Sequence, residues 1–314
     1  MHFRDVFEFL HRHTAAGEAA VLVTVCAVEG SSMRNPGSVM AVAQDGSYAG
    51  SLSGGCIENA VIAEALDALD AAGSRIVRFG AGSRYLDIKL PCGGGLDLHF
   101  QPLWDDSLAT QCLASINSRA PFSVALSDAG AQHIAQWHRP VFDTEAGTAT
   151  FGYWPEPRLA IVGHGAGVEA LHDMAQAMGC AVQVFTPDDR IAAALERKGR
   201  PVTPLSKVTQ VEALEGDAWT AFVFLFHDHD WEIDLMTRAL ELPHFYLGAM
   251  GGRKAHQMRI AALGAKGIAD SRLNTIRAPI GIFHSSRDPQ TLALSTLAEV
   301  IRTYQDADFG AGIA

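Results

Sequence analysis

The stretch Ile161-Val162-Gly163-His164-Gly165-Ala166-Gly167-Val168 joins a short apolar run to a segment with helical periodicity. Glycines at such a junction let backbone N–H groups approach a phosphate at the positive end of the helix. The pattern is incomplete, because it reads G-x-G-x-x-V from Gly163 and G-x-G-x-x-A from Gly165. Asp188 follows a little over 20 residues later, about where a ribose-binding acid would lie. The stretch indicates a nucleotide or phosphate site; the alternative is that its glycines only allow tight packing of helix on strand.

Strand and helix patterns alternate on both sides of this stretch. They are Leu159 to Val162, Val168 to Met178, Ala181 to Phe185, Ala221 to Phe226 and Trp231 to Leu240. Such alternation is typical of parallel strands joined by crossover helices, so we expect a Rossmann-like, doubly wound parallel sheet. Prolines at positions 155 and 157 indicate a domain edge. The 314 residues are therefore predicted to form two domains, 1–152 and 153–314.

The first half is predicted to be a mixed α/β domain. A helix over 3–15 and a buried strand over 20–28 precede a hairpin at Asp45-Gly46, a dipeptide whose tight turn needs positive φ at both central positions. The loop Ser53-Gly54-Gly55-Cys56 then leads into a helix over 57–69. Further strands are expected at 75–79, 86–90 and 96–102.

Cys56 has two interpretations. A thiol at a helix N-terminus next to glycines is where free N–H groups and the macrodipole lower the pKa of the thiol, which favours a nucleophile or soft-metal ligand. The alternative is a small buried hydrophobic residue. Cys92, in the loop Pro91-Cys92-Gly93-Gly94-Gly95, is either a second ligand or incidental to a tight turn. Cys26, Cys112 and Cys180 lie in apolar patterns and are predicted to be core.

Two polar segments follow strands in the second half. The cluster His227-Asp228-His229-Asp230 could bind a metal, but its place after an apolar strand favours a role in lining a ligand site, with Asp230 capping the next helix. In the loop that runs from Gly248 to Arg253, Arg253 could bind a phosphate with both ends of its guanidinium. The alternative is a solvated arginine at a helix start.

The composition excludes several classes of protein. A formal net charge of -11 without any basic run argues against nonspecific nucleic-acid binding. No apolar stretch approaches the roughly 20 residues of a membrane span, and acids at positions 5 and 8 argue against an export signal. Five widely spaced cysteines are an odd number, which fits free thiols in a reducing compartment. We expect a cytoplasmic protein.

Taken together, these motifs resemble the XdhC/CoxI family, the accessory proteins of molybdenum-cofactor enzymes such as xanthine dehydrogenase. In the first half the resemblance rests on residues 29–37 with Met40, residues 50–58 and residues 92–94. In the second half it rests on residues 163–165, residues 188–190, His229-Asp230 with Asp234, residues 246–251 and residues 279–281. The resemblance covers nearly the whole chain.

The resemblance implies a chaperone that binds the molybdenum cofactor, as molybdopterin or its dinucleotide form. Such a protein protects the cofactor while a cysteine desulfurase installs its terminal sulfur, and inserts it into a molybdoenzyme of the xanthine dehydrogenase/aldehyde oxidoreductase type. A pterin dithiolene with a phosphate needs a soft thiolate near molybdenum, here Cys56 and Cys92, and N–H groups for the phosphate. The residues expected to bind the cofactor are Arg34, Ser53, Gly54, Gly55, Cys56, Cys92, Gly93, Gly163, Gly165, Asp188, Arg190, His229, Gly248 and Arg253.

The chain departs from the family pattern at Val168, where a small residue is usual, and over Ile282 to Asp288, where the family has a glycine-containing stretch. We expect these changes to alter a pocket and leave the fold intact. Because no acid–base pair is evident beside the cysteine loops, an accessory factor is expected rather than a turnover enzyme, and a homodimer is a reasonable assembly. The alternatives are an NAD(P)-dependent oxidoreductase, supported by the Rossmann-like half, and an interaction module whose loops are structural.

Overall fold

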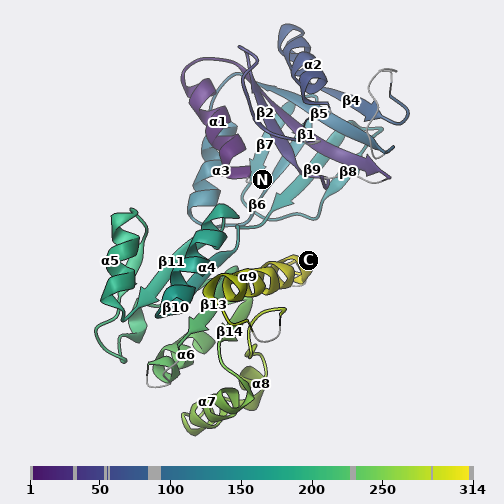
Figure 1. Cartoon of the computed structure of the whole chain (residues 1–314). Helices are drawn as coiled ribbons and strands as arrows, with labels where there is room; N and C mark the ends of the chain where they lie inside the picture. The colour runs from purple at the N-terminus through teal and green to yellow at the C-terminus, as the bar shows by residue number, and fades with distance from the viewer. Residues whose placement is uncertain are drawn as a thin grey trace. The chain divides into compact units, whose positions relative to one another are not determined.

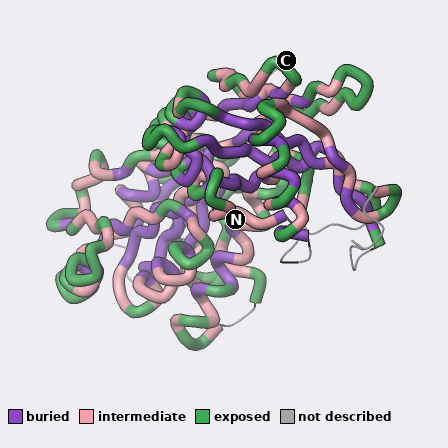
Figure 2. Tube along the Cα trace, turned by 90° about the horizontal axis from the view of Figure 1, so that it is seen from above, coloured by how far each residue is buried: buried purple, intermediate pink, exposed green. Residues whose placement is uncertain are grey.

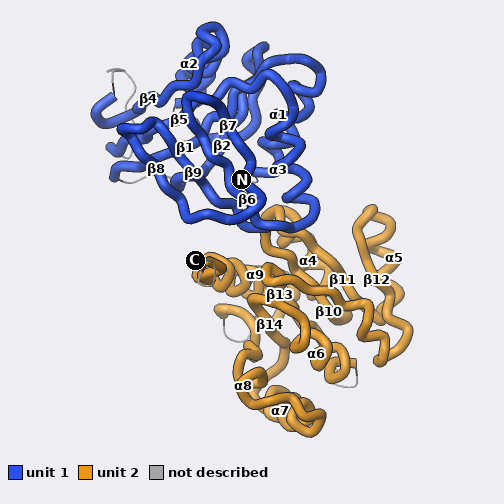
Figure 3. The backbone as a smooth tube through the Cα atoms, turned by 180° about the vertical axis from the view of Figure 1, so that it is seen from behind, with its two compact units in different colours: residues 1–155, 313–314 blue, residues 156–312 orange. Residues whose placement is uncertain are grey.

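A computed structural model describes residues 3–30, 34–52, 55, 57–83, 93–226, 231–283 and 286–310. The chain divides into two compact units, Met1–Pro155 and Glu156–Gly312, drawn in blue and orange in Figure 3. Buried side chains form two core clusters in each unit, one on either face of its main sheet. The central strands of these sheets are almost continuously buried, and long buried stretches run through both units (Figure 2).

The first unit is built around a five-stranded antiparallel sheet in the order β3-β2-β1-β5-β4 (Figure 1). The central strand β1 (Ala20–Glu29) pairs with β2 (Val39–Ala43) on one side and with β5 (Gly95–Leu103) on the other. The edge strands are β3 (Tyr48–Gly50) and β4 (Arg75–Gly80). The central position of β1, covered on both faces, explains why its sequence is a continuous apolar run.

Helices cover the two faces of this sheet. Helix α2 (Glu58–Asp70) packs on one face, and α1 (Phe3–Ala15) and α3 (Ser107–Asn117) pack on the other. A second antiparallel sheet, in the order β7-β6-β9-β8, shares the core with α1 and α3. Its strands are β6 (Phe122–Ser127), β7 (Gly130–Ile134), β8 (Val141–Asp143) and β9 (Thr148–Tyr153).

The second unit is a doubly wound domain with a parallel sheet in the order β12-β11-β10-β13-β14. Helices α4, α5 and α9 contribute to the core on one face, and α6, α7 and α8 to the core on the other. Its strands are β10 (Arg158–Gly163), β11 (Ala181–Thr186), β12 (Val202–Pro204), β13 (Thr220–Leu225) and β14 (Tyr246–Ala249). Its helices are α4 (Ala166–Ala177), α5 (Asp189–Arg197), the 3-10 turn η1 (Val211–Ala213), α6 (Glu232–Glu241), α7 (Arg253–Ala265), α8 (Asp270–Leu273) and α9 (Pro289–Asp306).

The predicted fold class is confirmed, because a mixed α/β unit precedes a parallel, doubly wound one. The prediction for the turn at Asp45-Gly46 is wrong in detail. Only Gly46 has a positive φ there, of +81°, and Asp45 instead accepts a hydrogen bond from the backbone N–H of Ser47 at 2.8 Å. The strand expected at 86–90 lies outside the described residues. No helix in the described ranges combines the length and apolar character needed to cross a bilayer.

Alanine substitution at two neighbouring glycines of the second unit should affect the free energy of unfolding differently. A Cβ on Gly163 would lie 2.5 Å from the Leu225 carbonyl oxygen, whereas one on the helical Gly167 would meet nothing closer than 3.8 Å. We expect Gly163→Ala to lower the free energy of unfolding by about 1–3 kcal/mol. Gly167→Ala should leave it unchanged or raise it by up to about 1 kcal/mol. Urea unfolding of the two variants tests this, and equal effects would contradict the packing described.

Candidate functional site

Three loops of the first unit leave the same end of the five-stranded sheet. Strand β1 ends at Glu29, which pairs with Gly95 at the start of β5, and Gly95 also pairs with Gly80 at the end of β4. The end of β3 at Gly50 pairs with Met40 near the start of β2. The antiparallel register therefore gathers at one end the segments that connect β1 to β2, β3 to α2 and β4 to β5. These segments contain Arg34, the Gly-Cys loop (residues 51–57) and Cys92.

The buried carboxylate of Glu58 organises the Gly-Cys loop. Its Oε1 accepts hydrogen bonds from the Ser51 hydroxyl at 2.8 Å and the Leu52 N–H at 3.2 Å. Its Oε2 accepts from the N–H groups of Gly55 at 2.9 Å and Ile57 at 3.2 Å. Glu58 is only 6% exposed and is the first residue of α2, where a negative charge also meets the positive end of the helix. One carboxylate thus replaces water as the partner of the loop's donors.

The segment after β1 is attached to this loop and to the second sheet. Arg34 donates from Nε to the Ser51 carbonyl oxygen at 2.9 Å. The Tyr153 hydroxyl donates to the Gly37 carbonyl oxygen at 3.0 Å, and a Cβ on Gly37 would come within 3.3 Å of the Phe151 ring. Arg34 is therefore held beside the Gly-Cys loop by contacts on both sides of its segment.

Arg78 fixes the third loop. Its guanidinium pairs with Asp97 at 3.0 Å and with Glu29, and its Nε donates to the Ala81 carbonyl oxygen at 2.7 Å. A Cβ on Gly95 would lie 2.9 Å from the Ala81 backbone carbonyl oxygen, which favours glycine there. The ends of β1, β4 and β5 are thereby tied together where the loop that carries Cys92 begins and ends.

At the predicted metal site, the structure describes residues next to the two cysteines but not the cysteines themselves. Ser53, Gly54, Cys56 and Cys92 lie outside the described residues. Gly55 and Gly93 are exposed, with φ of +108° and +69°, and a Cβ on either would meet nothing within 4 Å. Among the described residues, no group of three or more His, Cys, Asp or Glu side chains could hold a metal ion.

The other three cysteines are core residues, as predicted. Cys26, Cys112 and Cys180 are 3%, 0% and 7% exposed. Burial raises the pKa of the Cys26 thiol to about 12 and that of the Cys180 thiol to about 11. The pKa of the Cys112 thiol is also raised by burial. These thiols are neutral at physiological pH.

Two roles were predicted for the glycine loop of the second unit, tight packing and anion binding, and they fall on different residues. Gly163 packs against Leu225, whose carbonyl oxygen also accepts from the His164 N–H at 3.2 Å. Gly165 has φ of +82°, open space beside it, and caps α4 without a side-chain hydrogen bond. Tight packing accounts for Gly163, whereas Gly165 leaves the N–H groups at the start of α4 accessible to an anion.

The remaining predicted residues of this unit are spread along its sheet edge. Asp188 Oδ1 accepts from the N–H groups of Arg190 and Ile191 at 3.0 and 3.4 Å, so Asp188 caps α5. Arg190 and Arg253 are exposed at the starts of α5 and α7. The Gly248 backbone packs against Ile280. His229 and its cluster lie outside the described residues.

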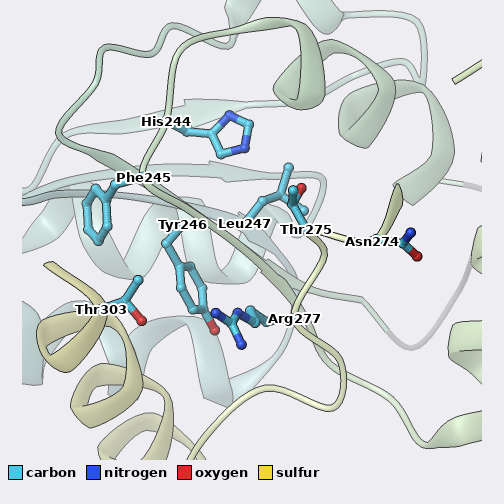
Figure 4. Close-up of a pocket in the computed structure, with 8 residues that line it drawn as sticks. All are labelled: His244, Phe245, Tyr246, Leu247, Asn274, Thr275, Arg277 and Thr303. Atoms are coloured by element: carbon cyan, nitrogen blue, oxygen red, sulfur yellow. The ribbon is translucent and has the colours of Figure 1, made fainter. Parts of the chain in front are cut away.

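A cavity of about 460 Å³ lies beside the edge strand β14, toward its first residues (Figure 4). Tyr246 and Arg277 line it, and the Tyr246 hydroxyl donates to Glu299 at 2.8 Å. Burial and the Glu299 charge raise the pKa of Tyr246. Ligands of doubly wound sheets bind at the carboxyl ends of the strands. This cavity is at the other end of β14, and we assign it no ligand.

Sequence reasoning missed the role of Glu58. The available signal was an acid in the first turn of a predicted helix, two residues after a glycine-rich loop. The roles of Arg78 and of the buried pair Arg259–Glu232 were also missed, because nothing local in the sequence shows that residues 19 and 27 positions apart are partners.

Comparison with known proteins gives matches over nearly the whole chain. The XdhC Rossmann domain matches residues 159–300, and the XdhC and CoxI family matches residues 13–80. The molybdenum cofactor insertion chaperone PaoD of Escherichia coli is 33% identical over 315 aligned positions, which cover 97% of this chain and 90% of PaoD. A Bacillus subtilis protein named as a probable xanthine dehydrogenase component is 23% identical, over 91% of this chain and 93% of its own length.

One solved structure shares the fold throughout. A crystal structure described as a xanthine dehydrogenase from Bacillus halodurans aligns with a TM-score of 0.78 at 19% identity, and the alignment covers 98% of each chain. At that identity, the likeness concerns the fold alone.

Replacement of Glu58 should loosen the Gly-Cys loop. Glu58→Gln leaves an amide nitrogen that cannot accept hydrogen bonds, so at least one loop donor loses its partner at a cost of about 1–3 kcal/mol. Hydrogen–deuterium exchange of the peptide over 51–57 should accelerate. The matched control is Glu64→Gln on the same helix, where Glu64 is 2% exposed and pairs with Arg75 at 3.1 Å. Equal exchange in the loop of both variants would contradict the assigned role.

Alkylation should distinguish the three core cysteines. A pKa of about 11 in place of 9.0 for Cys180 leaves roughly a hundredfold less thiolate at neutral pH, and burial blocks access as well. We expect iodoacetamide at pH 7.5 to spare Cys26, Cys112 and Cys180 in the native protein and to label all three in urea, as read by peptide mass spectrometry. Rapid native labelling of any of them would contradict this burial.

Proposed function

We propose that this protein, which belongs to the XdhC and CoxI family, is a chaperone that binds the molybdenum cofactor and inserts it into a molybdoenzyme. The observation that carries the proposal is the 33% identity to a molybdenum cofactor insertion chaperone over 97% of this chain. The convergence of three loops on one end of the first sheet supports it. The cofactor is cargo here, and is handed on rather than turned over.

The geometry favours a metal-binding role for the Gly-Cys loop over a phosphate-binding one. Glu58 already occupies the N–H groups of Gly55 and Ile57, which a phosphate at the start of α2 would need. These N–H groups are thus occupied, in contrast to the free N–H groups expected from the sequence. We therefore propose that Cys56 acts as a soft ligand of bound molybdenum, with Cys92 as a second, rather than as a free nucleophile.

We propose that the second unit, taken by itself, contains a phosphate site. Gly165 is the N-cap of α4 and offers no side-chain cap, so the N–H groups of Ala166 and Gly167 are available to an anion. Exposed Arg190 and Arg253 begin two other helices of this unit and can add positive charge.

The proposal extends to the reaction sequence around the chaperone. A cysteine desulfurase supplies the terminal sulfur while the cofactor is bound, and the acceptor is a molybdoenzyme of the xanthine dehydrogenase/aldehyde oxidoreductase type. We place these steps in the cytoplasm and propose a homodimer as the working form. Light scattering of the purified protein tests the dimer, and a single-chain mass would exclude it.

Molybdenum content tests the central proposal. The protein is purified from cells that make the cofactor, and molybdenum and pterin are measured per chain for wild type, Cys56→Ala and Cys92→Ala. Removal of a group that holds the metal should lower the molybdenum content by about tenfold or more. Cys180→Ala, which removes a buried thiol of the other unit, is the matched control and should load normally.

Two results would contradict the proposal. Equal loading of Cys56→Ala and wild type would remove Cys56 from the site. A wild type that carries neither molybdenum nor pterin but binds a nicotinamide nucleotide tightly would favour the oxidoreductase instead.

A further inference from the structure

A cavity of about 450 Å³ lies at the carboxyl end of β14, at the sheet edge where ligands of doubly wound domains bind. Its walls are the loop Met250–Gly252, the segment around Gly281, and Leu292 at the start of α9. A cavity of this size is within the range of small-molecule sites. Its walls come from the loop between Gly248 and Arg253 and from residues 279–286, segments that the sequence analysis singled out, although none of the lining residues is among those expected to bind the cofactor.

One wall is fixed by helix α9. The Gly281 N–H donates to Glu299 Oε2 at 2.6 Å, and the Phe283 N–H donates to the hydroxyl of fully buried Ser295 at 2.7 Å. Gly281 has φ of +95°, and a Cβ on it would lie 2.4 Å from the Ser295 hydroxyl oxygen. Glycine is required there, so the wall is built in advance of any ligand.

The opposite wall is fixed by a buried ion pair. Arg259 and Glu232 are both fully buried; Arg259 Nη2 donates to Glu232 Oε1 at 2.9 Å and to the Met250 carbonyl oxygen at 2.8 Å. Nε and Nη1 of Arg259 have no hydrogen-bond partner within the described ranges. Such a pair adds little net stability compared with apolar residues of similar volume. Its effect here is to hold the loop Met250–Gly252 in place.

The cavity combines an aromatic surface with hydrogen-bond donors. Phe283 lines it and is 45% exposed, so one part of its ring is free to stack. Ser286 also lines it, and its hydroxyl oxygen is buried without a partner in the part of the chain that the structure describes. Gly252 is the N-cap of α7 and provides no side-chain cap, so backbone N–H groups are available at the start of this helix.

The cavity is close to the proposed phosphate site of the same unit. Leu292 lines the cavity, and its Cδ2 would lie 3.8 Å from a Cβ on Gly167, in the first turn of α4. In the sheet, β14 is separated from β10 by one strand, so their ends are about 10 Å apart. One ligand can therefore place a phosphate at Gly165 and a ring in the cavity.

We propose that this cavity binds the flat nitrogen heterocycle of a phosphate-bearing ligand, with the ring against Phe283 and its polar edge at Ser286 and the start of α7. The inference rests on the proposed function, in which that ligand is the organic end of the cofactor. Two rings share this chemistry: the pterin itself and the base of a nucleotide extension.

Calorimetric titration of the full-length protein without cofactor tests the inference. The probes are CMP, GMP, AMP and neopterin monophosphate, with inorganic phosphate as the reference ligand. Binding of a nucleotide only assigns the cavity to the base, and binding of neopterin monophosphate only assigns it to the pterin. If no probe binds more tightly than inorganic phosphate, the ring contributes nothing and the inference fails.

Blocking the cavity locates the bound ring. Gly252 has φ of -74°, and a Cβ on it would meet nothing within 4 Å, so Gly252→Trp introduces a large side chain without backbone strain. We expect this substitution to weaken the affinity for the tightest-binding probe by tenfold or more. Gln257→Trp, exposed further along α7 and outside the cavity lining, is the matched control and should bind as wild type does. Phe283→Leu should lower the affinity for the probes that carry a ring and leave the affinity for inorganic phosphate unchanged.

The two proposals fail differently. If Gly252→Trp binds every probe as wild type does while Cys56→Ala loses molybdenum in cofactor-producing cells, the cavity inference is overturned and the chaperone function stands. If Gly252→Trp abolishes probe binding but wild type never carries molybdenum or pterin, the cavity is a heterocycle site and the chaperone function is overturned.

Discussion

The loop end of the first unit depends on one buried carboxylate. Glu58 accepts four hydrogen bonds from the Gly-Cys loop while only 6% exposed. Buried backbone N–H groups need hydrogen-bond partners. Here the loop folds around the Glu58 carboxylate, which accepts these hydrogen bonds in place of a neighbouring strand or helix turn. Because Arg34 also bonds to the Ser51 carbonyl oxygen, the segment after β1 takes its position from the same loop. The sheet register brings the three loops to one end of the sheet, and Glu58 fixes the conformation of the Gly-Cys loop.

The second unit follows the same principle with different groups. Glu299 and Ser295 of α9 hold the wall around Gly281, and Arg259 holds the loop after β14. In each case a side chain on a neighbouring helix fixes a segment that has no secondary structure of its own. Both units thus place irregular loops at the end of a sheet and hold them with charged or hydroxyl groups.

The sequence predicted the sheets better than the site. Alternating strand and helix patterns identified the parallel unit, and the apolar run over 20–28 identified β1, because burial on both faces leaves a strong local pattern. The strands between residues 122 and 153 are short and mostly only partly buried, which leaves a weak local pattern, yet they form a complete sheet. The role of Glu58, and the distant pairs that fix Arg78 and Arg259, depend on contacts that no local pattern encodes.

The central claim is that the Gly-Cys loop holds the metal end of the cargo through Cys56. X-ray absorption at the molybdenum edge, on protein purified with bound cofactor, measures this directly. The account predicts one more sulfur neighbour of molybdenum in wild type than in the cofactor that remains on Cys56→Ala. Identical sulfur counts in the two proteins would contradict it.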